Sequence, residues 1–468
     1  MDVEMTERME NKSSTVAETP KQGEGTHAQK TWWNPSVWTD RMLAALVNGV
    51  KGGKWFSLYD KVFNPVNLES AWVKVKSNRG GSGSDGQSVH KFDMKSKDEL
   101  SKLSGQLRAG SYVPQPTLRK WIPKPGGKEM RPLGIPAVRD RVAQTALRNV
   151  VEPIFEAGFS GRSYGFRPGR GCKDALREVD RLLKAGYLWI VDADLKSYFD
   201  TIPHEKLMGL VEERIADGKI LALLRSHLNQ GVMDGLKEWI PDEGTPQGAV
   251  ISPLLANIYL NPLDHEMAEK RFEMVRYADD FVVLCRSREE ADEALSHIRE
   301  WTMKAELTLH PEKTRIVHEV EGFEFLGYRF EKSRRWPRKK SGDKLKDKIR
   351  KETRRKSGKS LEETINRLNA TLRGWYGYFK HCHKFTFSKL DGWIRRRLRT
   401  ILKKREGKGK WKYKRKDHIR WPNVFFQAHG LFSLARAHAT ECQSLNIKTT
   451  INRRAGCGKS ASPVRREG

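Results

Sequence analysis

Two short β-rich runs separated by a pair of aspartates are the feature that most restricts how this chain can fold. Residues 274–277 and 281–285 flank Ala278-Asp279-Asp280, which predicts a hairpin with an acidic tip. A further apolar run, 187–191, leads into Asp192 and Asp194 and predicts a buried strand with acids at its end. Neighbouring aspartates on a straight strand point to opposite faces, whereas in a tight turn both can approach one place. The pattern indicates a mixed α and β body in which these carboxylates meet.

Carboxylates grouped in this way are suited to divalent cations. Mg²⁺ prefers oxygen ligands and keeps several of its waters, so two or three carboxylates from neighbouring strands are enough to hold it. Nucleotidyl transfer to a 3′-hydroxyl uses two such cations about 3.5–4 Å apart. Taken alone, however, Asp279-Asp280 is better explained as an ordinary solvated turn. Motifs elsewhere in the chain are needed to distinguish a metal-binding site from a solvated turn.

The charge of the chain is distributed unevenly. The formal net charge of the 468 residues is +30. Residues 331–468 hold 41 basic and 11 acidic residues, so this C-terminal part carries the whole excess, and residues 1–330 are neutral overall. A neutral body followed by a strongly basic part indicates a long polyanion as partner, most simply nucleic acid.

Several classes of protein are excluded at this point. No stretch approaches the roughly 20 apolar residues that span a bilayer, and the acidic, polar start of the chain is unlike a signal peptide. The five cysteines are odd in number and scattered, without a Cys-x-x-Cys pair, which argues against a disulfide framework and fits a reducing cytoplasm. We therefore expect a cytoplasmic protein without a membrane partner. Residues 1–30 lack hydrophobic periodicity and are predicted to form a disordered tail.

The spacing of apolar residues predicts the elements around the acids. Residues 203–217 have helical spacing, with Gly218 as the C-terminal stop. Ser252-Pro253 predicts a capped helix start with proline at its first position. An acidic helix at 289–304 and a strand around 323–330 complete the body. Farther on, helices are expected with an apolar stripe from Ile365 to Phe379 and again at 393–402, before a lysine-rich link and an aromatic module at 421–439.

A series of motifs runs through the body in a fixed order. They are 79–86, 122–136 (IPKPGGKEMRPLGIP), 164–168 (YGFRP), 192–200 (DADLKSYFD), 244–248 (GTPQG), 277–280 (YADD), 310–314 (HPEKT) and 325–328 (FLGY), followed by 373–379 (RGWYGYF). Each is weak alone, but their order is highly specific. With this series the chain resembles the group II intron-encoded reverse transcriptases and maturases of bacteria, in a form that lacks the C-terminal endonuclease domain.

The resemblance implies an α+β right-hand polymerase fold of fingers, palm and thumb, followed by a basic, largely helical maturase region. It implies fingers and palm at 31–330, a thumb and RNA-binding maturase domain at 331–415, and a DNA-binding region with a basic tail at 416–468. It also implies two Mg²⁺ ions, replaceable by Mn²⁺, on the catalytic acids Asp194, Asp279 and Asp280. Asp192 competes with Asp194; Asp194 is preferred because the family's acid stands five residues before Phe199.

The resemblance further assigns residues to the incoming nucleotide. Phe199 matches the side chain that blocks a ribose 2′-hydroxyl, although a phenylalanine of the core is the alternative. Lys124 and Arg131 match fingers residues that clamp the triphosphate, a role suited to a point charge and a planar fork; solvated loop charges are the alternative. The remaining expectations are nucleotide contacts at Leu195 and Gln247, a helix cap at Asp200 and a phosphate contact at Lys313.

The basic C-terminal part fits RNA and duplex binding. RNA contacts are predicted for six side chains: Arg373, Arg395, Arg396, Arg397, Lys412 and Lys414. Trp375 and Phe379 are at helical spacing and are expected to pack the thumb core rather than stack on bases.

The expected partners are group II intron RNA, target DNA with its primer, and deoxynucleoside triphosphates, while the oligomeric state stays open. Two other interpretations remain: a retron-type or other prokaryotic reverse transcriptase, or a maturase that has lost polymerase activity and only assists splicing. The long basic extension argues against the first, and the three intact acids argue against the second.

Overall fold

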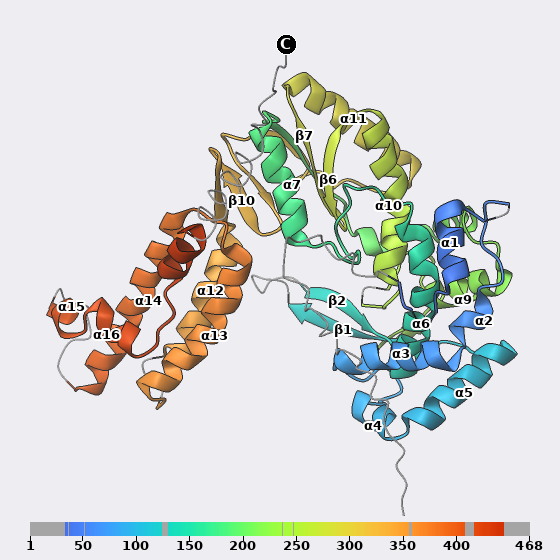
Figure 1. Ribbon diagram of the computed structural model, residues 1–468, viewed down its shortest axis with the longest axis horizontal. Helices are drawn as coiled ribbons and strands as arrows, with labels where there is room; N and C mark the ends of the chain where they lie inside the picture. The colour runs from blue at the N-terminus through green and yellow to red at the C-terminus, as the bar shows by residue number, and fades with distance from the viewer. Residues whose placement is uncertain are drawn as a thin grey trace, which may run out of the picture.

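The computed structural model describes residues 33–443 except 36, 51, 124–129, 236, 247, 355–357 and 408–415. The predicted tail at 1–30 lies outside the described residues. Figure 1 shows two bodies, a mixed α and β body at the N-terminal side and a helical body at the C-terminal side, joined near β10. In the described part of the chain, no helix is both long and apolar enough to cross a membrane.

The central sheet contains the predicted acidic strand and hairpin. Its strand order is β6-β7-β3-β8, and every pairing is antiparallel. The strands are β3 (Trp189–Asp194), β6 (Glu273–Tyr277), β7 (Asp280–Cys285) and β8 (Arg315–His318). Because side chains alternate across a strand, Val191 and Ala193 face one side and Ile190 faces the other with Asp192 and Asp194. The acids thus stand at the end of an otherwise apolar face.

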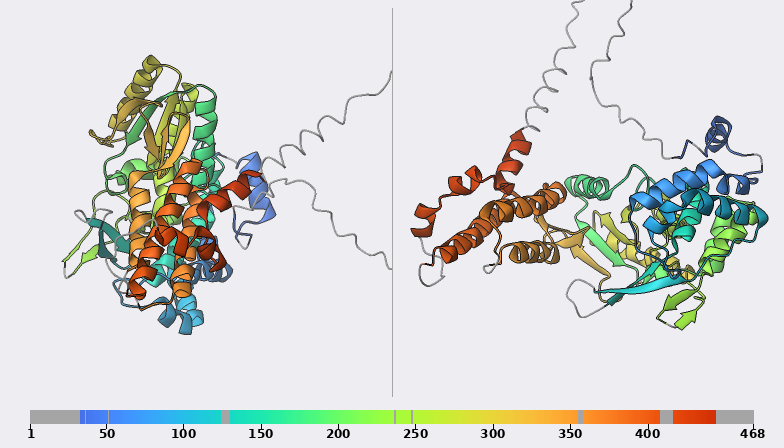
Figure 2. Two further views of the ribbon diagram at one scale, coloured as in Figure 1. Left: turned by 90° about the vertical axis from the view of Figure 1, so that its left-hand side faces the viewer. Right: turned by 90° about the horizontal axis from the view of Figure 1, so that it is seen from below.

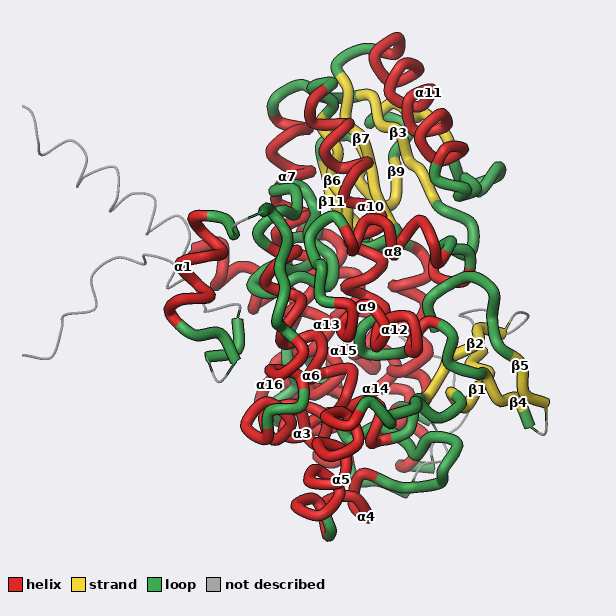
Figure 3. Tube along the Cα trace, turned by 90° about the vertical axis from the view of Figure 1, so that its right-hand side faces the viewer, coloured by secondary structure: helices red, strands yellow, loops and turns green. Residues whose placement is uncertain are grey.

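Helices cover both faces of this sheet (Figures 1 and 3). Buried side chains of α10 (Ser252–Glu269) and α11 (Arg288–Lys304) pack with Val191 and Ala193 in one core. α7 (Cys172–Lys184) packs on the opposite face with Ile190, Val282 and Leu284. Burial of the apolar strand faces between helices stabilises this layer.

A second sheet projects from the body beside a layer of helices (Figure 2). Its strand order is β2-β1-β4-β5, with β1 (Thr117–Pro123), β2 (Met130–Ile135), β4 (Val232–Asp234) and β5 (Lys237–Trp239). The helices of this half and of the connection are α1 (Asp40–Asn48), α2 (Tyr59–Val62), α3 (Pro65–Ser77), α4 (Val89–Met94), α5 (Ser96–Ala109), α6 (Val138–Glu156), α8 (His204–Glu212) and α9 (Gly218–Leu228). α6 is buried along most of its length and packs against α2, α3 and α5.

A small third sheet, of order β11-β10-β9, leads into the helical body. It consists of β9 (Phe323–Phe325), β10 (Tyr328–Glu331) and β11 (Arg334–Pro337). The helices that follow are α12 (Lys339–Glu352), α13 (Leu361–Phe379), α14 (Lys384–Arg405), α15 (Lys416–Arg420) and α16 (Asn423–Ala428), and residues 434–443 are also helical. The stripe Ile365, Leu368, Leu372 and Phe379 is buried as predicted, and Trp375 stacks on Phe379 with ring centroids 4.8 Å apart.

The structure corrects four expectations about elements. Gly218 is not a stop; it begins α9, because the Asp217 side chain accepts hydrogen bonds from the backbone N–H groups of Lys219 and Ile220. Pro253 stands at the start of α10 as predicted, but Ser252 does not cap the helix and donates instead to the Pro246 carbonyl. The run 323–330 is two strands rather than one, because Gly327 at φ +81° turns the chain back.

The fourth correction concerns Asp200. It lies in the short 3₁₀ helix η1 (Tyr198–Asp200), and α8 begins later without any side-chain cap. Asp200 therefore does not cap the following helix. The charges of Arg119 and Arg131 act on its carboxylate instead.

Candidate active site

The predicted catalytic acids come together at one end of the central sheet. In the register of β3 and β7, Asp194 stands directly opposite Asp280. Directly opposed residues of an antiparallel pair project to the same face, and Asp192 shares that face because it lies two residues from Asp194. Asp279 occupies the two-residue turn between β6 and β7, after Ala278 at φ +60°. Asp280 is thus the first residue of β7 rather than part of the turn.

The electrostatics of these carboxyl groups reflect their crowding. Burial, followed by repulsion from Asp192, Asp279 and Asp194, raises the pKa of Asp280 to about 7. Burial also raises the pKa of Asp192 to about 6, although Arg315 opposes this. The pKa of Asp279 is raised as well, by burial first and then by Asp194. Concentrated negative charge of this kind is stabilised by a cation.

Lys313 supplies one positive charge to this group. Its Nζ lies 2.6 Å from Asp194 Oδ2. The backbone sets this contact, because the N–H of His310 donates to the Asp194 carbonyl and the N–H of Lys196 donates to the Thr308 carbonyl. The resemblance predicts a phosphate contact for Lys313. In the structure its side chain instead forms an ion pair with Asp194, one of the predicted metal ligands. Among the described residues, no three or more Asp, Glu, His or Cys side chains are arranged to hold a metal ion.

The motifs of the body pack around this acidic end. A Cβ at Gly165 would lie 2.2 Å from the backbone nitrogen of Ala278, and one at Gly248 would lie 2.2 Å from the Gly134 carbonyl oxygen. A Cβ at Gly244 would meet the Asp200 carbonyl oxygen at 2.7 Å. Glycine is thus required at the three places where motif 164–168 contacts motif 277–280, and where motif 244–248 contacts motifs 122–136 and 192–200. Any side chain at these positions would displace the neighbouring backbone.

The three predicted nucleotide residues that the structure describes have different environments. Phe199 is 9 % exposed and belongs to the core, yet it also lines a cavity of about 300 Å³ with Arg119, Asp200 and Thr245. Arg131 is exposed on β2, and its charge lowers the pKa of Asp279 against the larger effect of burial. The Leu195 side chain is buried in the core, so only its backbone could serve a ligand. Lys124 and Gln247 lie outside the described residues.

The basic residues predicted to contact RNA fall on the helical body. Arg373 lies on α13 with its guanidinium over the Phe432 ring, 5.5 Å from the centroid. Arg395 is half-buried and Arg396 exposed on α14. Arg397 donates to Thr353 Oγ1 at 2.7 Å and to the Thr353 carbonyl, so it also joins two helical segments. Lys412 and Lys414 lie outside the described residues.

Sequence reasoning missed a buried network under the catalytic turn. Arg276, one residue before Tyr277, is fully buried and paired with Asp264 of α10. A charged residue within a short, mostly apolar strand was the available signal, because such a charge is buried only when it is paired.

Two protein families match separate parts of the chain. Residues 122–330 match the family described as reverse transcriptase (RNA-dependent DNA polymerase), and residues 343–421 match the group II intron maturase-specific domain. The chain is 36 % identical over 293 residues to Protein YkfC of Escherichia coli (strain K12), a match that covers 54 % of this chain and 76 % of that protein. It is 31 % identical over 361 residues to group II intron-encoded protein LtrA of Lactococcus lactis subsp. cremoris, covering 63 % of this chain and 59 % of LtrA.

Among solved structures, the chain is similar to one titled partial Cas6-RT-Cas1--Cas2 complex. The TM-score is 0.34 at 25 % identity, and the match covers 53 % of this chain and 41 % of that chain. A likeness this loose carries no argument about function.

The matches define a reverse transcriptase domain joined to a maturase domain, on a mixed helix and sheet fold with a helical C-terminal region. The chain belongs to the group II intron-encoded reverse transcriptases and maturases. Its domains are those of an RNA-directed DNA polymerase that also assists RNA splicing. The family was therefore identified correctly from the motif series.

Proposed function

We propose that this protein copies a group II intron RNA into DNA during intron mobility and binds the same RNA to promote its splicing. The observation that carries the proposal is the opposed pair Asp194 and Asp280, beside the turn residue Asp279, within the reverse transcriptase domain. The substrates would be intron RNA as template, a primer on target DNA, and deoxynucleoside triphosphates. The maturase-specific domain supports the intron RNA as the partner.

Reverse transcriptases generally use divalent metal ions, and the donors at this end of the sheet fit Mg²⁺ in type and charge. The fit rests on carboxylates that burial and mutual repulsion leave with raised pKa values, a cost that a bound cation offsets. Asp194 and Asp279 would be the main ligands, and Asp280 would join them as the third when the ions bind, since the described side chains do not already form such a group of three. Two bound Mg²⁺ ions, or Mn²⁺ in their place, would activate the primer hydroxyl and neutralise charge on the phosphates.

The other side chains would bind and orient the nucleotide. Arg131, whose charge already acts on Asp279 and Asp200, would hold the triphosphate together with Lys124. Phe199 would exclude the 2′-hydroxyl, and Leu195 and Gln247 would complete the nucleotide pocket. Lys313 keeps Asp194 in an ion pair at 2.6 Å, and it would exchange that pair for a phosphate oxygen when substrate binds.

We assign the remaining parts of the chain accordingly. Fingers and palm occupy 31–330, the thumb and RNA-binding domain 331–415, and the DNA-binding region 416–468. The six basic residues named above would contact RNA phosphates. A cytoplasmic site of action is supported by the described cysteines Cys172, Cys285, Cys382 and Cys442, which are all unpaired.

The test is extension of an oligo(dT) primer on poly(rA) with dTTP and Mg²⁺. The wild-type protein should synthesise DNA, and Asp279→Ala should reduce the rate at least about a thousandfold because it removes a carboxylate from the reacting centre. Binding of the primed template should stay within about twofold, since phosphate contacts elsewhere supply the affinity. Asp98→Asn, which alters an exposed carboxylate in the first turn of α5, is the control. Full activity of Asp279→Ala would rule out the turn as the catalytic site.

A further inference from the structure

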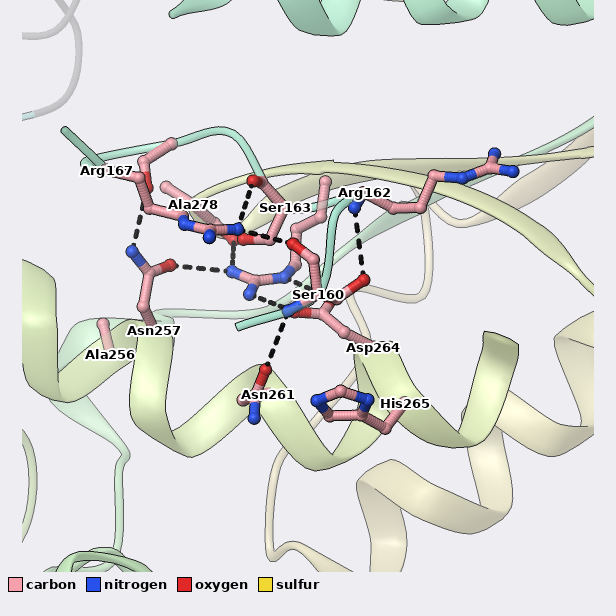
Figure 4. A network of polar contacts seen from close by, with 12 residues as sticks. Ser160, Arg162, Ser163, Arg167, Ala256, Asn257, Asn261, Asp264, His265 and Ala278 are labelled. Atoms are coloured by element: carbon pink, nitrogen blue, oxygen red, sulfur yellow. Dashed lines mark hydrogen bonds and ion pairs between the residues drawn. The ribbon is translucent and has the colours of Figure 1, made fainter. Parts of the chain in front are cut away.

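A single buried guanidinium reaches both an acid in α10 and the backbone of the catalytic turn. Arg276 Nε donates to Asp264 Oδ1 at 2.7 Å, and its Nη2 donates to Asp264 Oδ2. Its Nη1 donates to Asn257 Oδ1 at 2.9 Å and to the Ala278 carbonyl oxygen at 2.9 Å. Figure 4 shows Asn257 and Asp264 on one helix, with Ala278 on the opposite side of the network. Arg276 therefore connects α10 with the turn that holds Asp279.

The network is too costly to be explained by stability alone. The side chains of Arg276 and Asp264 are 1 % and 0 % exposed, respectively. Removing both charges from water carries a large desolvation penalty, and well-packed apolar residues are often equally stable at such positions. What apolar residues could not supply is a directed donor to the Ala278 carbonyl. The pair therefore favours one particular backbone geometry.

That geometry is one which the turn does not adopt easily. Ala278 has φ +60°, a left-handed conformation that is strained for an L-residue with a Cβ. Ala278 directly precedes Asp279, so its dihedral angles decide where the Asp279 carboxylate points. A hydrogen bond to the Ala278 carbonyl offsets part of this strain and opposes rotation of the peptide that joins the two residues.

The same network fixes the backbone on the other side of the turn. Asn257 Nδ2 donates to the Gly165 carbonyl at 2.8 Å, and Gly165 lies against Ala278 with no room for a Cβ. The backbone of Arg276 also pairs with this segment: its N–H donates to the Arg162 carbonyl and its carbonyl accepts from the Tyr164 N–H. The turn is thus held between the 162–165 segment and α10 (Figure 4).

We propose that Arg276, oriented by Asp264 and Asn257, is a positioning residue that fixes the Ala278–Asp279 peptide and so aims the Asp279 carboxylate at the reacting centre. This inference rests on the proposed function, in which Asp279 belongs to the catalytic group. Arg276 touches no substrate itself; it acts through the Ala278 carbonyl. The pairing with Asp264 holds the guanidinium plane, so that one nitrogen is left to serve the turn.

The experiment compares Arg276→Lys with Asp140→Asn. Lysine keeps a positive charge opposite Asp264, but its donors sit on one nitrogen and cannot reproduce the separate bonds of the three guanidinium nitrogens to Asp264, Asn257 and Ala278. Asp140 is a fully buried carboxylate on α6 that accepts from the Tyr112 hydroxyl and the Gln115 N–H, away from the turn. Its substitution is a matched loss of buried hydrogen bonding. Both variants are measured for thermal stability, primer extension and amide hydrogen exchange of the 273–285 segment.

We expect Arg276→Lys to lower kcat by about ten- to a hundredfold, with KM for dTTP within about threefold, because the carboxylate is misplaced rather than lost. Amide exchange in 273–285 should accelerate at least about tenfold. Asp140→Asn should lower the melting temperature while leaving kcat and the exchange of this segment near wild type.

Two results would overturn the proposal. One is Arg276→Lys with wild-type kcat and unchanged exchange; the other is an equal fall in kcat in Asp140→Asn at the same loss of stability. If Arg276→Lys does not fold, Asn257→Ala is measured in the same way and must show faster exchange of the turn. The exchange measurement needs no catalysis. Absence of DNA synthesis by the wild-type protein would therefore count against the proposed function, while the exchange would still report on the network.

Discussion

Phe199 belongs to the core and also borders the cavity in which we propose that the nucleotide sugar binds. It packs edge-to-face with Tyr198 at 5.5 Å and Phe166 at 6.4 Å between ring centroids, and it also lines the cavity beside Asp200. The two interpretations left open by the sequence are therefore compatible. A ring that is held by its neighbours is a better steric barrier than a mobile one, because it does not yield to a 2′-hydroxyl.

We predict that Phe199→Val admits ribonucleotides. The shorter side chain opens space beside the 2′-carbon, whereas full truncation to alanine at a buried site costs about 3–5 kcal/mol and would confuse the result. The ratio of rUTP to dTTP use, measured by primer extension on poly(rA), should rise at least about tenfold. Tyr198→Phe, which alters the adjacent buried ring without opening the cavity, is the control. An unchanged ratio in Phe199→Val would leave Phe199 as a core residue only.

The crowded acids also make stability depend on pH. Because the pKa of Asp280 is raised to about 7, the folded protein holds this proton more tightly than the unfolded chain, in which aspartate titrates near 3.9. The stabilisation from the bound proton is complete below about pH 4 and is lost as pH rises to about 7. Above that range the folded state carries an unfavourable buried charge when no divalent cation is present.

We therefore predict that Asp280→Asn is more stable than wild type in EDTA at pH 8, by roughly 1–3 kcal/mol, and that the difference shrinks by pH 5. Thermal unfolding monitored by circular dichroism at both pH values measures this. Asp242→Asn, at an exposed site, should show no such trend. A difference in melting temperature that is the same at pH 5 and pH 8 would contradict the assignment of Asp280 as the buried proton-binding group.

Individual elements could be predicted where hydrophobic periodicity and capping residues agree. The acidic helix is confirmed as α11, beginning one residue earlier at Arg288 because Ser287 caps it, and the stripe of α13 is buried. The acidic hairpin is confirmed as β6 and β7. Boundaries failed where a single residue has two possible roles: Gly218 begins a helix instead of ending one, and Gly327 splits one predicted strand into two.

Pairings between distant segments could not be predicted. The spacing of apolar residues shows which face of a strand or helix is buried, but not which other segment packs against that face. The parallel pairing of Thr117 and Leu118 with Val232 and Met233 joins segments more than a hundred residues apart. The opposition of Asp194 to Asp280 depends on the register of β3 and β7, which neither segment specifies alone. The motifs named the candidate acids through resemblance, but the Arg276 network depends on three-dimensional packing that they do not contain.

At the scale of the whole molecule, chemistry and charge are separated. The acids lie in the neutral part of the chain, and the net charge of +30 lies after residue 330, in the part of the sequence that includes α12 to α14 (Figure 1). Each phosphate contact with single-stranded RNA contributes about −0.7 to the slope of log affinity against log salt. Binding of intron RNA should therefore depend mainly on the C-terminal body, while DNA synthesis depends on the central sheet.

We predict that the two activities can be lost separately. Replacing Arg395 and Arg396 by alanine should weaken intron binding and reduce the magnitude of the salt slope by about 1.4, while extension of a pre-annealed primer at saturating template changes little. Arg397 is left intact because it holds Thr353. The control, Lys97→Ala with Lys102→Ala, removes the same charge from exposed positions of α5 in the neutral body and should alter the slope less.

In the opposite direction, Asp279→Ala should abolish DNA synthesis and still promote splicing, because folding an intron RNA needs bound protein rather than nucleotide chemistry. The measurement is splicing of precursor RNA by the purified variant at near-physiological salt, alongside its affinity for the intron. Carboxylate removal at the turn leaves the contacts of α13 and α14 unchanged, so the splicing rate should stay within about threefold of wild type once affinities match. A variant that binds the intron normally but cannot promote splicing would show that the central sheet and the helical body act together on the RNA.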